Sequence, residues 1–428
     1  MTRHLTWQDF YSLQRFGMTP NLDNIRLFCE RLGHPEASYP SVHVGGTNGK
    51  GSVTAMLDCV LRSAGMKVGM YTSPHILRFE ERIRVGGQLI PEKDVFEFLG
   101  EHWDFIESHC CTFFEVATAM GLEYFRRGGV DVAVVEVGLG GTHDATRVVQ
   151  SLLSVVTRID LDHTDRLGNT LEQIAAEKAG IFRSGYPAVT GDQRPEVLAV
   201  LKARTKEIGA EFLQAKDLIS LASTSITSRQ ISGTATLKCL QPPLILKRWK
   251  CPLVGAYQIE NVRLVLAASS LLMAQFQQIN VAAIVRGIET VKWPGRLQEL
   301  RRNPHLILDV AHNPGAVCAV VQNVREIWKP RKTIVIFSAL RDKDIPAMMT
   351  CLKGTASEAF IVPLPPPRGM SLEEISALAR KAEWNARPVL SVSEAMTAAL
   401  RLAGRKDLIL AIGSHYLAEE VLKYQENA

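Results

Sequence analysis

The sequence has no cysteine spacing of the kind that holds zinc or forms a redox pair. Its eight cysteines are scattered, Cys110-Cys111 is the only close pair, and neither a C-x-x-C motif nor a His/Cys zinc pattern occurs. We expect such thiols to stay reduced, as they do in the cytosol. The sequence therefore predicts neither a metal-thiolate site nor a disulfide framework.

Long apolar segments and basic tracts are missing as well. The stretch from Met1 to Thr6 lacks the apolar core of a signal peptide, and no uncharged run approaches the ~20 residues that span a bilayer. The 49 Lys and Arg against 44 Asp and Glu give a net charge of +5, without a tract that indicates nucleic-acid binding. We expect a soluble, cytoplasmic monomer whose partners are small molecules, not nucleic acids or membranes.

What the sequence does contain is a glycine-rich turn between a strand and a helix. Residues 41–44 are typical of a short strand, residues 45–52 read GGTNGKGS, and apolar residues recur at helical spacing over 53–64. Backbone N–H groups in such a turn cradle phosphates, with Lys50 on the β/γ oxygens and Ser52 near Mg²⁺. The first glycine comes one residue later than in the general P-loop pattern. We predict a nucleotide site that includes Asn48, Gly49, Lys50, Gly51 and Ser52.

Strand-like and helix-like segments alternate along most of the chain, which at 428 residues is long enough for two or three domains of ~150 residues. Strands are predicted at 41–44, 67–71, 131–137, 152–157 and 186–189, then at 305–310, 332–337, 358–362, 388–391 and 407–412. Between the two sets, residues 215–255 suggest short antiparallel strands, and Trp293-Pro294-Gly295 is the best boundary. The predicted fold is α/β, with a P-loop NTPase-like N-terminal domain (1–294), which has a parallel sheet and a small antiparallel subsheet, and a smaller Rossmann-like C-terminal domain (295–428).

Several polar residues follow predicted strands and so belong at the sheet edge that faces the ligand crevice. Glu136 ends a continuous apolar strand, and an ionised carboxylate there needs a cation, so it is either a Mg²⁺ ligand or half of a buried salt bridge. Ser73 and His163 follow two other strands; the alternatives are a turn cap for Ser73 and a hydrogen-bonded structural role for His163. In the second unit, Asp309 could bind ribose or orient a cation, and Arg296 lies where closure could bring it onto phosphates.

Together these stretches resemble the folylpolyglutamate synthase/dihydrofolate synthase family, within the Mur ligase group of ATP-dependent amide-forming enzymes. The resemblance runs in family order from about residue 10 to the end and is carried by the segments 46–52, 72–75, 136–141, 161–164, 177–181, 294–296 and 309–314. It implies a Mur ligase-type ATP-binding domain followed by a glutamate ligase domain. The implied reaction adds L-glutamate to dihydropteroate and to folates through an acyl phosphate.

The resemblance also implies roles that the residues alone do not give. Ser52, Ser73, Glu136 and His163 resemble magnesium ligands for one or two ions, and Asn261, Arg296 and Asp309 resemble ATP contacts. Lys178, on its own a plausible surface lysine at a helix end, resembles the carbamylated lysine of the family. The catalytic candidates are thus Lys50, Lys178 and His312.

The substrate-binding candidates come from the same resemblance and are Met18, Thr19, Thr112, Phe113, Phe114, Glu115, His143, Asp144 and Ala145. The stretch His143-Asp144-Ala145-Thr146 resembles the bifunctional bacterial form. Arg147 departs from it, because Asn often follows Asp-Ala-Thr there. The alternatives are therefore a folylpolyglutamate synthase without the second activity, or another Mur-type amino-acid ligase.

The same motifs disfavour two further functions. A ligase acting on a nucleotide-linked muropeptide would need a dedicated domain before the P-loop, where only about 40 residues stand. A GTPase-like switch is suggested by Asp165-Arg166-Leu167-Gly168, but no N-K-x-D guanine-reading motif occurs. Both are therefore disfavoured.

Overall fold

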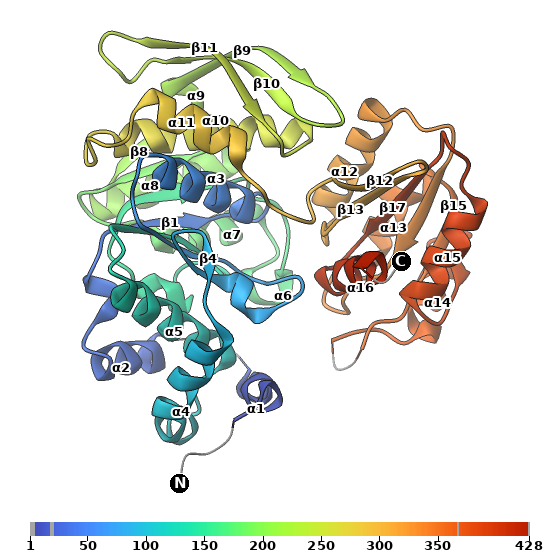
Figure 1. The fold of residues 1–428 in the computed structure, drawn as a ribbon, viewed down its shortest axis with the longest axis horizontal. Coiled ribbons are helices and arrows are strands. Elements are labelled where there is room, and N and C mark those ends of the chain that lie inside the picture. The colour runs from blue at the N-terminus through green and yellow to red at the C-terminus, as the bar shows by residue number, and fades with distance from the viewer. Residues whose placement is uncertain (1–4, 18–20, 366–367, 427–428) are drawn as a thin grey trace.

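The computed structural model describes residues 5–17, 21–365 and 368–426, whose strands form three sheets (Figure 1). The eight-stranded and three-stranded sheets lie in one part of the molecule, and the six-stranded sheet lies in another beside it. In the described part of the chain, no helix is long and apolar enough to cross a membrane.

The eight-stranded sheet has the order β4-β3-β2-β5-β1-β6-β7-β8. Its strands are β1 (Ser41–Gly45), β2 (Val68–Tyr71), β3 (Ile83–Val85), β4 (Gln88–Leu89), β5 (Val132–Glu136), β6 (Ser151–Val156), β7 (Pro187–Thr190) and β8 (Glu211–Gln214). All neighbours from β2 to β8 pair in parallel, and β3 and β4 form an antiparallel edge. Every residue of β5 is buried, as expected for a parallel strand covered on both faces.

Helices cover both faces of this sheet. The helices are α1 (Trp7–Ser12), α2 (Asp23–Arg31), α3 (Lys50–Ser63), α4 (Glu92–Ser108), α5 (Phe113–Gly128), α6 (Thr164–Leu167), α7 (Leu171–Lys178), α8 (Pro195–Ile208), α9 (Ala215–Leu218), α10 (Ala256–Leu272) and α11 (Val281–Thr290). One core contains α3, α10 and α11, and another contains α1, α2, α4 and α5. A Cβ on Gly287 of α11 would collide with the backbone of Val60 in α3. These two helices therefore pack at a distance that requires glycine.

The three-stranded sheet is antiparallel, in the order β11-β10-β9, and lies against α10 and α11 (Figure 1). Its strands are β9 (Ile219–Ile226), β10 (Ile231–Leu237) and β11 (Leu244–Cys251). Alternate residues of β10 are buried, so one face of the sheet packs on the core. The predicted antiparallel strands over 215–255 are confirmed.

The six-stranded sheet has the order β12-β13-β17-β14-β15-β16, with only β12 antiparallel to its neighbour. Its strands are β12 (Gln298–Arg302), β13 (His305–Asp309), β14 (Thr333–Phe337), β15 (Ala356–Ile361), β16 (Arg387–Pro388) and β17 (Leu408–Ile412). Helices α12 (Pro314–Ile327), α13 (Ile345–Lys353) and α14 (Leu372–Lys381) share one core. Helices α15 (Val392–Leu402) and α16 (His415–Glu426) share the core on the other face.

The predicted fold class, two α/β units with an antiparallel subsheet, is confirmed by these sheets. Strands β8 and β12 were not predicted from the sequence, because both are short, half-exposed edge strands. The predicted strand at 388–391 is shorter than expected, since β16 ends at Pro388 and α15 begins at Val392. The domain boundary between residues 294 and 295 stays a prediction.

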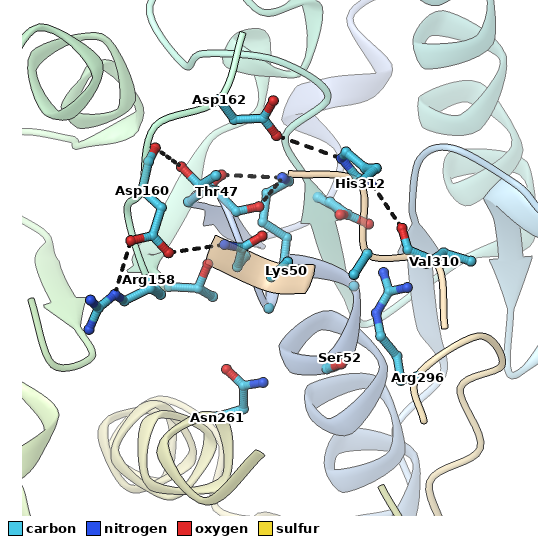
Figure 2. A pocket seen from close by; sticks show the side chains of 18 of the residues that line it. Thr47, Lys50, Ser52, Arg158, Asp160, Asp162, Asn261, Arg296, Val310 and His312 are labelled. Carbon is cyan, nitrogen blue, oxygen red and sulfur yellow. Dashed lines mark hydrogen bonds and ion pairs between the residues drawn. The ribbon is translucent and has the colours of Figure 1, made fainter. Parts of the chain in front are cut away.

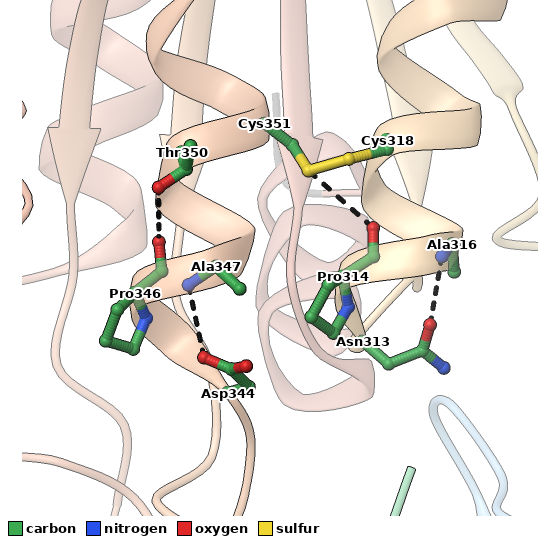
Figure 3. The surroundings of a disulfide bond; sticks show 9 residues. All are labelled: Asn313, Pro314, Ala316, Cys318, Asp344, Pro346, Ala347, Thr350 and Cys351. Atoms are coloured by element: carbon green, nitrogen blue, oxygen red, sulfur yellow. Dashed lines mark hydrogen bonds between the residues drawn. A yellow bond between two sulfur atoms is a disulfide. The ribbon is translucent and has the colours of Figure 1, made fainter. Parts of the chain in front are cut away.

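The expectation that all thiols are reduced is wrong for one pair. Cys318 in α12 and Cys351 in α13 form a disulfide with a Cα–Cα distance of 5.2 Å (Figure 3). The two cysteines are 33 residues apart in the sequence and meet only because the two helices pack side by side. Sequence spacing therefore could not reveal the pair. The other six cysteines are free.

Candidate active site

The glycine-rich turn joins β1 to α3, and its carbonyl groups surround the amine of Lys50. Lys50 Nζ donates to the carbonyls of Gly46 and Thr47, at 3.2 Å each. The backbone N–H groups of Thr47 and Asn48 donate to the carbonyl of Arg158, which ties the turn to the end of β6. A phosphate in this cradle would meet the amino end of a 14-residue helix and the half-buried cation of Lys50.

A cavity of about 530 Å³ opens at the carboxyl ends of β1, β2, β5, β6 and β7 and extends to the six-stranded sheet (Figure 2). It brings together all of the predicted nucleotide, metal and catalytic residues: Asn48, Gly49, Lys50, Gly51, Ser52, Ser73, Glu136, His163, Lys178, Asn261, Arg296, Asp309 and His312. This is the ligand crevice expected for an open α/β sheet. The residues predicted from the sequence therefore share one cavity.

Glu136 lies at the end of β5 with its carboxylate buried in this cavity. Its Oε2 accepts a hydrogen bond from the backbone N–H of Ser73 at 3.3 Å. Burial raises the pKa of Glu136 to about 7, although the nearby cation of Lys50 opposes the rise. No ion pair to Glu136 within 4.0 Å forms among the described residues. The carboxylate is thus held where a cation would stabilise its charged form.

Lys178 ends α7 and is buried, not exposed as its position in the sequence alone suggested. Its Nζ donates to the carbonyl of Gly46 at 2.9 Å, so it contacts the phosphate-binding turn. Burial and the neighbouring charge of Lys50 lower the pKa of Lys178 to about 7. A substantial fraction of this amine is therefore neutral and nucleophilic at neutral pH.

His163 lies in a network that connects the two large sheets. Lys343, from the loop after β14, donates to Asp162 Oδ1 at 2.7 Å and lies 3.1 Å from His163 Nε2. Asn313, which caps α12, donates to Asn48 Oδ1 at 3.0 Å and to Asp162 Oδ2 at 3.2 Å. Burial lowers the pKa of His163 to about 4, so the ring is neutral and Nε2 accepts from Lys343.

The six-stranded sheet contributes Asp309, Arg296 and His312 to the cavity. Asp309 Oδ1 and Oδ2 accept from the backbone N–H groups of Ala311 and Leu297, both at 2.8 Å. Burial raises the pKa of Asp309, and Arg296 opposes the rise. His312 is held by a 2.9 Å contact of Nδ1 with the carbonyl of Val310, and burial lowers its pKa to about 4. Figure 2 shows Arg296 and His312 on the side of the cavity opposite Asp160.

The predicted substrate-binding residues are not part of the cavity lining among the described residues. Thr112 and Glu115 form the capping box of α5, with Thr112 N–H donating to Glu115 Oε2 at 2.8 Å. The Phe114 ring fills the space beside Gly138, and Asp144 Oδ2 accepts from Leu139 N–H at 2.8 Å. Both contacts support the loop 138–140, which does line the cavity. Phe113 and Ala145 are buried, His143 is exposed, and Met18 and Thr19 lie outside the described residues.

Three polar residues of this region were missed in the sequence analysis. Lys343 follows β14 and His415 follows β17, so the rule that pointed to Glu136 also applies to them. Asn313 was quoted only as part of a motif, yet it bridges the sheets. His415 lies 5.6 Å from His312 between ring centroids and lines the cavity. The position after a strand was the signal that could have identified Lys343 and His415.

Comparison with known proteins agrees with this geometry. The Mur ligase middle domain family matches residues 44–269, and the Mur ligase glutamate ligase domain family matches residues 295–415. The dihydrofolate synthase/folylpolyglutamate synthase of Bacillus subtilis is 33% identical over 424 residues, which cover 96% of either chain. The chain belongs to the dihydrofolate synthase/folylpolyglutamate synthase family.

Solved structures of this family have the same fold. The Mycobacterium tuberculosis folylpolyglutamate synthase complexed with ADP has a TM-score of 0.90 and 29% identity, over 98% of both chains. Escherichia coli FolC in complex with DHPP and ADP has a TM-score of 0.87 and 32% identity, over 98% of this chain and 97% of that one. A dihydrofolate synthase/folylpolyglutamate synthase fold is thus present over nearly the whole chain.

Proposed function

We propose that this chain uses ATP to join L-glutamate to the carboxylate of dihydropteroate and of reduced folates. The observation that carries the proposal is one cavity in which the Lys50 cradle of the first sheet meets Arg296, Asp309 and His312 of the six-stranded sheet. Membership of the dihydrofolate synthase/folylpolyglutamate synthase family supports the substrates, and the ADP in related structures supports the nucleotide.

The reaction needs an activated acid, because a carboxylate oxygen is a poor leaving group. Transfer of the γ-phosphoryl group of ATP to the acceptor carboxylate gives an acyl phosphate and ADP. The amine of glutamate then attacks the acyl carbon, the amide forms, and phosphate leaves. We assign Lys50 and Arg296, among the cations that line the cavity, to stabilise charge on the transferred group, which is the main contribution in phosphoryl transfer.

The oxygen-rich edge of the cavity fits one or two Mg²⁺ ions. Mg²⁺ is commonly held by one or two carboxylates together with hydroxyl, water and phosphate oxygens. Glu136 supplies a buried carboxylate, and Ser52 and Ser73 supply hydroxyls. No group of three or more His, Cys, Asp and Glu side chains in the described segments could hold a metal ion by itself, so phosphate oxygens would complete the site. Bound Mg²⁺ would supply positive charge to the phosphates. His163 could join this set only if Lys343 released its Nε2.

Lys178 is proposed to carry a carbamate. Its buried amine, with a pKa of about 7, can attack carbon dioxide in the neutral form, losing a proton and becoming an acidic group. A negative charge there would relieve the repulsion between Lys178 and Lys50, whose pKa is also lowered by burial. Substitution of Lys178 by Ala should abolish turnover while leaving the fold intact.

The acceptor is proposed to lie against the loop 138–140, between the cavity and α5. Phe114 and Asp144 contact this loop without lining the cavity, and would fix its position against the pterin group. Asn261 and Asp309 would contact ATP, since Asn261 lies against Gly49 of the turn. Closure of the two sheets around the reactants would exclude water that hydrolyses an acyl phosphate.

A second candidate is a folylpolyglutamate synthase without the dihydrofolate synthase activity. The residue that favours it is Arg147, which follows the Asp144-Ala145-Thr146 segment and is half-buried beside it. The two candidates share the ATP chemistry and differ only in the acceptor. Monomeric state and cytoplasmic location stay predictions.

The deciding experiment measures ADP release by the purified protein with glutamate and either dihydropteroate or a reduced folate. We expect ADP only when both glutamate and an acceptor are present. Release with both acceptors supports the bifunctional enzyme, whereas release with the folate alone supports the second candidate. Release without glutamate or an acceptor would contradict the ligase.

A further inference from the structure

A second cavity, of about 800 Å³, lies at the amino ends of the strands of the eight-stranded sheet. The nucleotide cavity lies at their carboxyl ends. The second cavity is lined by segments that lead into the strands: residues 38–40 before β1, residues 148–152 at the start of β6, and Tyr186 before β7. The nucleotide cavity is lined by the residues that follow these same strands. The two cavities therefore lie at opposite ends of the same strands and are distinct sites.

Three arginines line this second cavity: Arg26 on α2, Arg147 before β6, and Arg183 before β7. In the described part of the chain, no carboxylate pairs with any of them: Arg26 is exposed, and Arg147 and Arg183 are half-buried. One Nη of Arg183 donates to the carbonyls of Arg147 and Val149, which fixes the backbone next to Arg147. Burial and the charges of Arg204 and Arg26 lower the pKa of Arg147, so its neighbours are cations.

Two residues of the cavity, Ser151 and Glu36, each have a side-chain oxygen that is buried in the protein and does not face the cavity. Ser151 is only 1% exposed, and its hydroxyl has no hydrogen-bond partner among the described residues. The Oε2 atom of Glu36 is buried without a partner as well, while its Oε1 contacts His34 Nδ1 at 3.0 Å. The charged side chains of the cavity are therefore its three arginines and Glu36, which leaves an excess of positive charge.

We propose that this cavity binds a small anion with at least two negative charges, carried by phosphate or carboxylate groups. Arg26, Arg147 and Arg183 are its cationic partners. Guanidinium groups match phosphate and carboxylate oxygens in planar, paired hydrogen bonds. An anion there also relieves the mutual repulsion of the three cations.

The test is a calorimetric titration of the full chain with the nucleotide cavity saturated by ADP and Mg²⁺. Inorganic pyrophosphate and a γ-linked triglutamate are titrated separately, so the probe that binds identifies phosphate or carboxylate chemistry. We expect one site for at least one probe, with affinity reduced about tenfold or more by Arg147→Gln and by Arg26→Gln. The Lys50→Ala variant should retain this site, because Lys50 lies at the opposite end of the strands.

Arg229→Gln, in the exposed turn between β9 and β10, serves as the matched control and should leave binding unchanged. Arg26 is exposed on the surface of α2, so its substitution tests the site even if Arg147→Gln impairs folding. Absence of binding by both probes, or binding that both arginine substitutions leave intact, would overturn the proposal.

Discussion

Lys343 Nζ lies 2.7 Å from Asp162 Oδ1, and the two side chains are only 5% and 8% exposed. The pair joins the loop after β14 of one sheet to the loop after β6 of the other, 181 residues away in the sequence. Burial alone would raise the pKa of Asp162, but His312 and Lys343 hold it below its ordinary value. The ionised carboxylate is therefore a fixed point of contact between the two halves of the cavity.

Substitution of Lys343 by Met should weaken this contact and leave Asp162 buried without its cation. We expect a loss of about 3 kcal/mol or less in unfolding free energy, because the cavity can rehydrate the carboxylate. Turnover should fall on the order of tenfold, because the catalytic groups from the two sheets are no longer held in their relative positions. Guanidinium unfolding and steady-state ADP release measure the two effects.

Lys353→Met is the control for that substitution. Lys353 pairs with Glu383 at 3.4 Å on the surface, and such exposed pairs contribute about 0.5 kcal/mol. If Lys343→Met and Lys353→Met behaved alike in both assays, the interpretation of Lys343 as a bridge would be wrong.

Substitution of Gly49 by Ala should impair nucleotide binding more than stability. Gly49 has a φ of +99°, and a Cβ there would lie 2.6 Å from Asn261 Oδ1. The positive φ costs about 1 kcal/mol for alanine, and the collision displaces Asn261 from the turn. We expect the affinity for ADP, measured by calorimetry, to fall about tenfold or more.

Gly65, which follows the other end of α3, provides a matched control. Its φ is +86°, yet a Cβ there would meet nothing within 4 Å. Gly65→Ala should lose similar stability and keep its affinity for ADP. Equal loss of ADP affinity in both variants would show that backbone strain in α3, and not the contact with Asn261, controls the site.

The residues at the strand ends of the eight-stranded sheet could be predicted from the sequence, whereas the contacts between the two sheets could not. Glu136 and Ser73 follow strands, and parallel strands bring such residues to one edge, so their clustering could be inferred. The bridge from Lys343 to Asp162 depends on how two separate sheets approach one another, which no local pattern encodes. The burial of Lys178 was likewise invisible, because its helix is too short to show a clear buried face.

The low pKa of Lys178 predicts a pH dependence of stability. The folded-state pKa is about 7, while the same amine in the unfolded chain titrates near its ordinary 10.5. Between these values the unfolded chain binds more protons, so the stability contributed by Lys178 rises with pH from about 7 to 10.5 and is constant below 7. Urea unfolding of the wild type and of Lys178→Met, in carbon dioxide-free buffer, should show this difference. Parallel stability curves over that window would contradict it.

Loss of the disulfide between Cys318 and Cys351 should destabilise the six-stranded sheet region. A bridge that closes a loop of 33 residues contributes about 4 kcal/mol in the chain-entropy relation. Cys351→Ser should lose about that amount in oxidising buffer, and the wild type should lose it when dithiothreitol is added. Cys110→Ser, at an exposed free cysteine, is the control and should behave as the wild type. A wild-type protein insensitive to dithiothreitol would show that the bridge does not contribute.

The most direct test of the central claim, that ATP activates the acceptor carboxylate, follows an oxygen atom. Dihydropteroate labelled with ¹⁸O in its carboxylate is incubated with ATP, glutamate and the enzyme, and the released phosphate is analysed by mass spectrometry. An acyl phosphate intermediate transfers one ¹⁸O atom from the acid to inorganic phosphate, and this is the result we expect. Amide formation with no ¹⁸O in the phosphate would contradict the account.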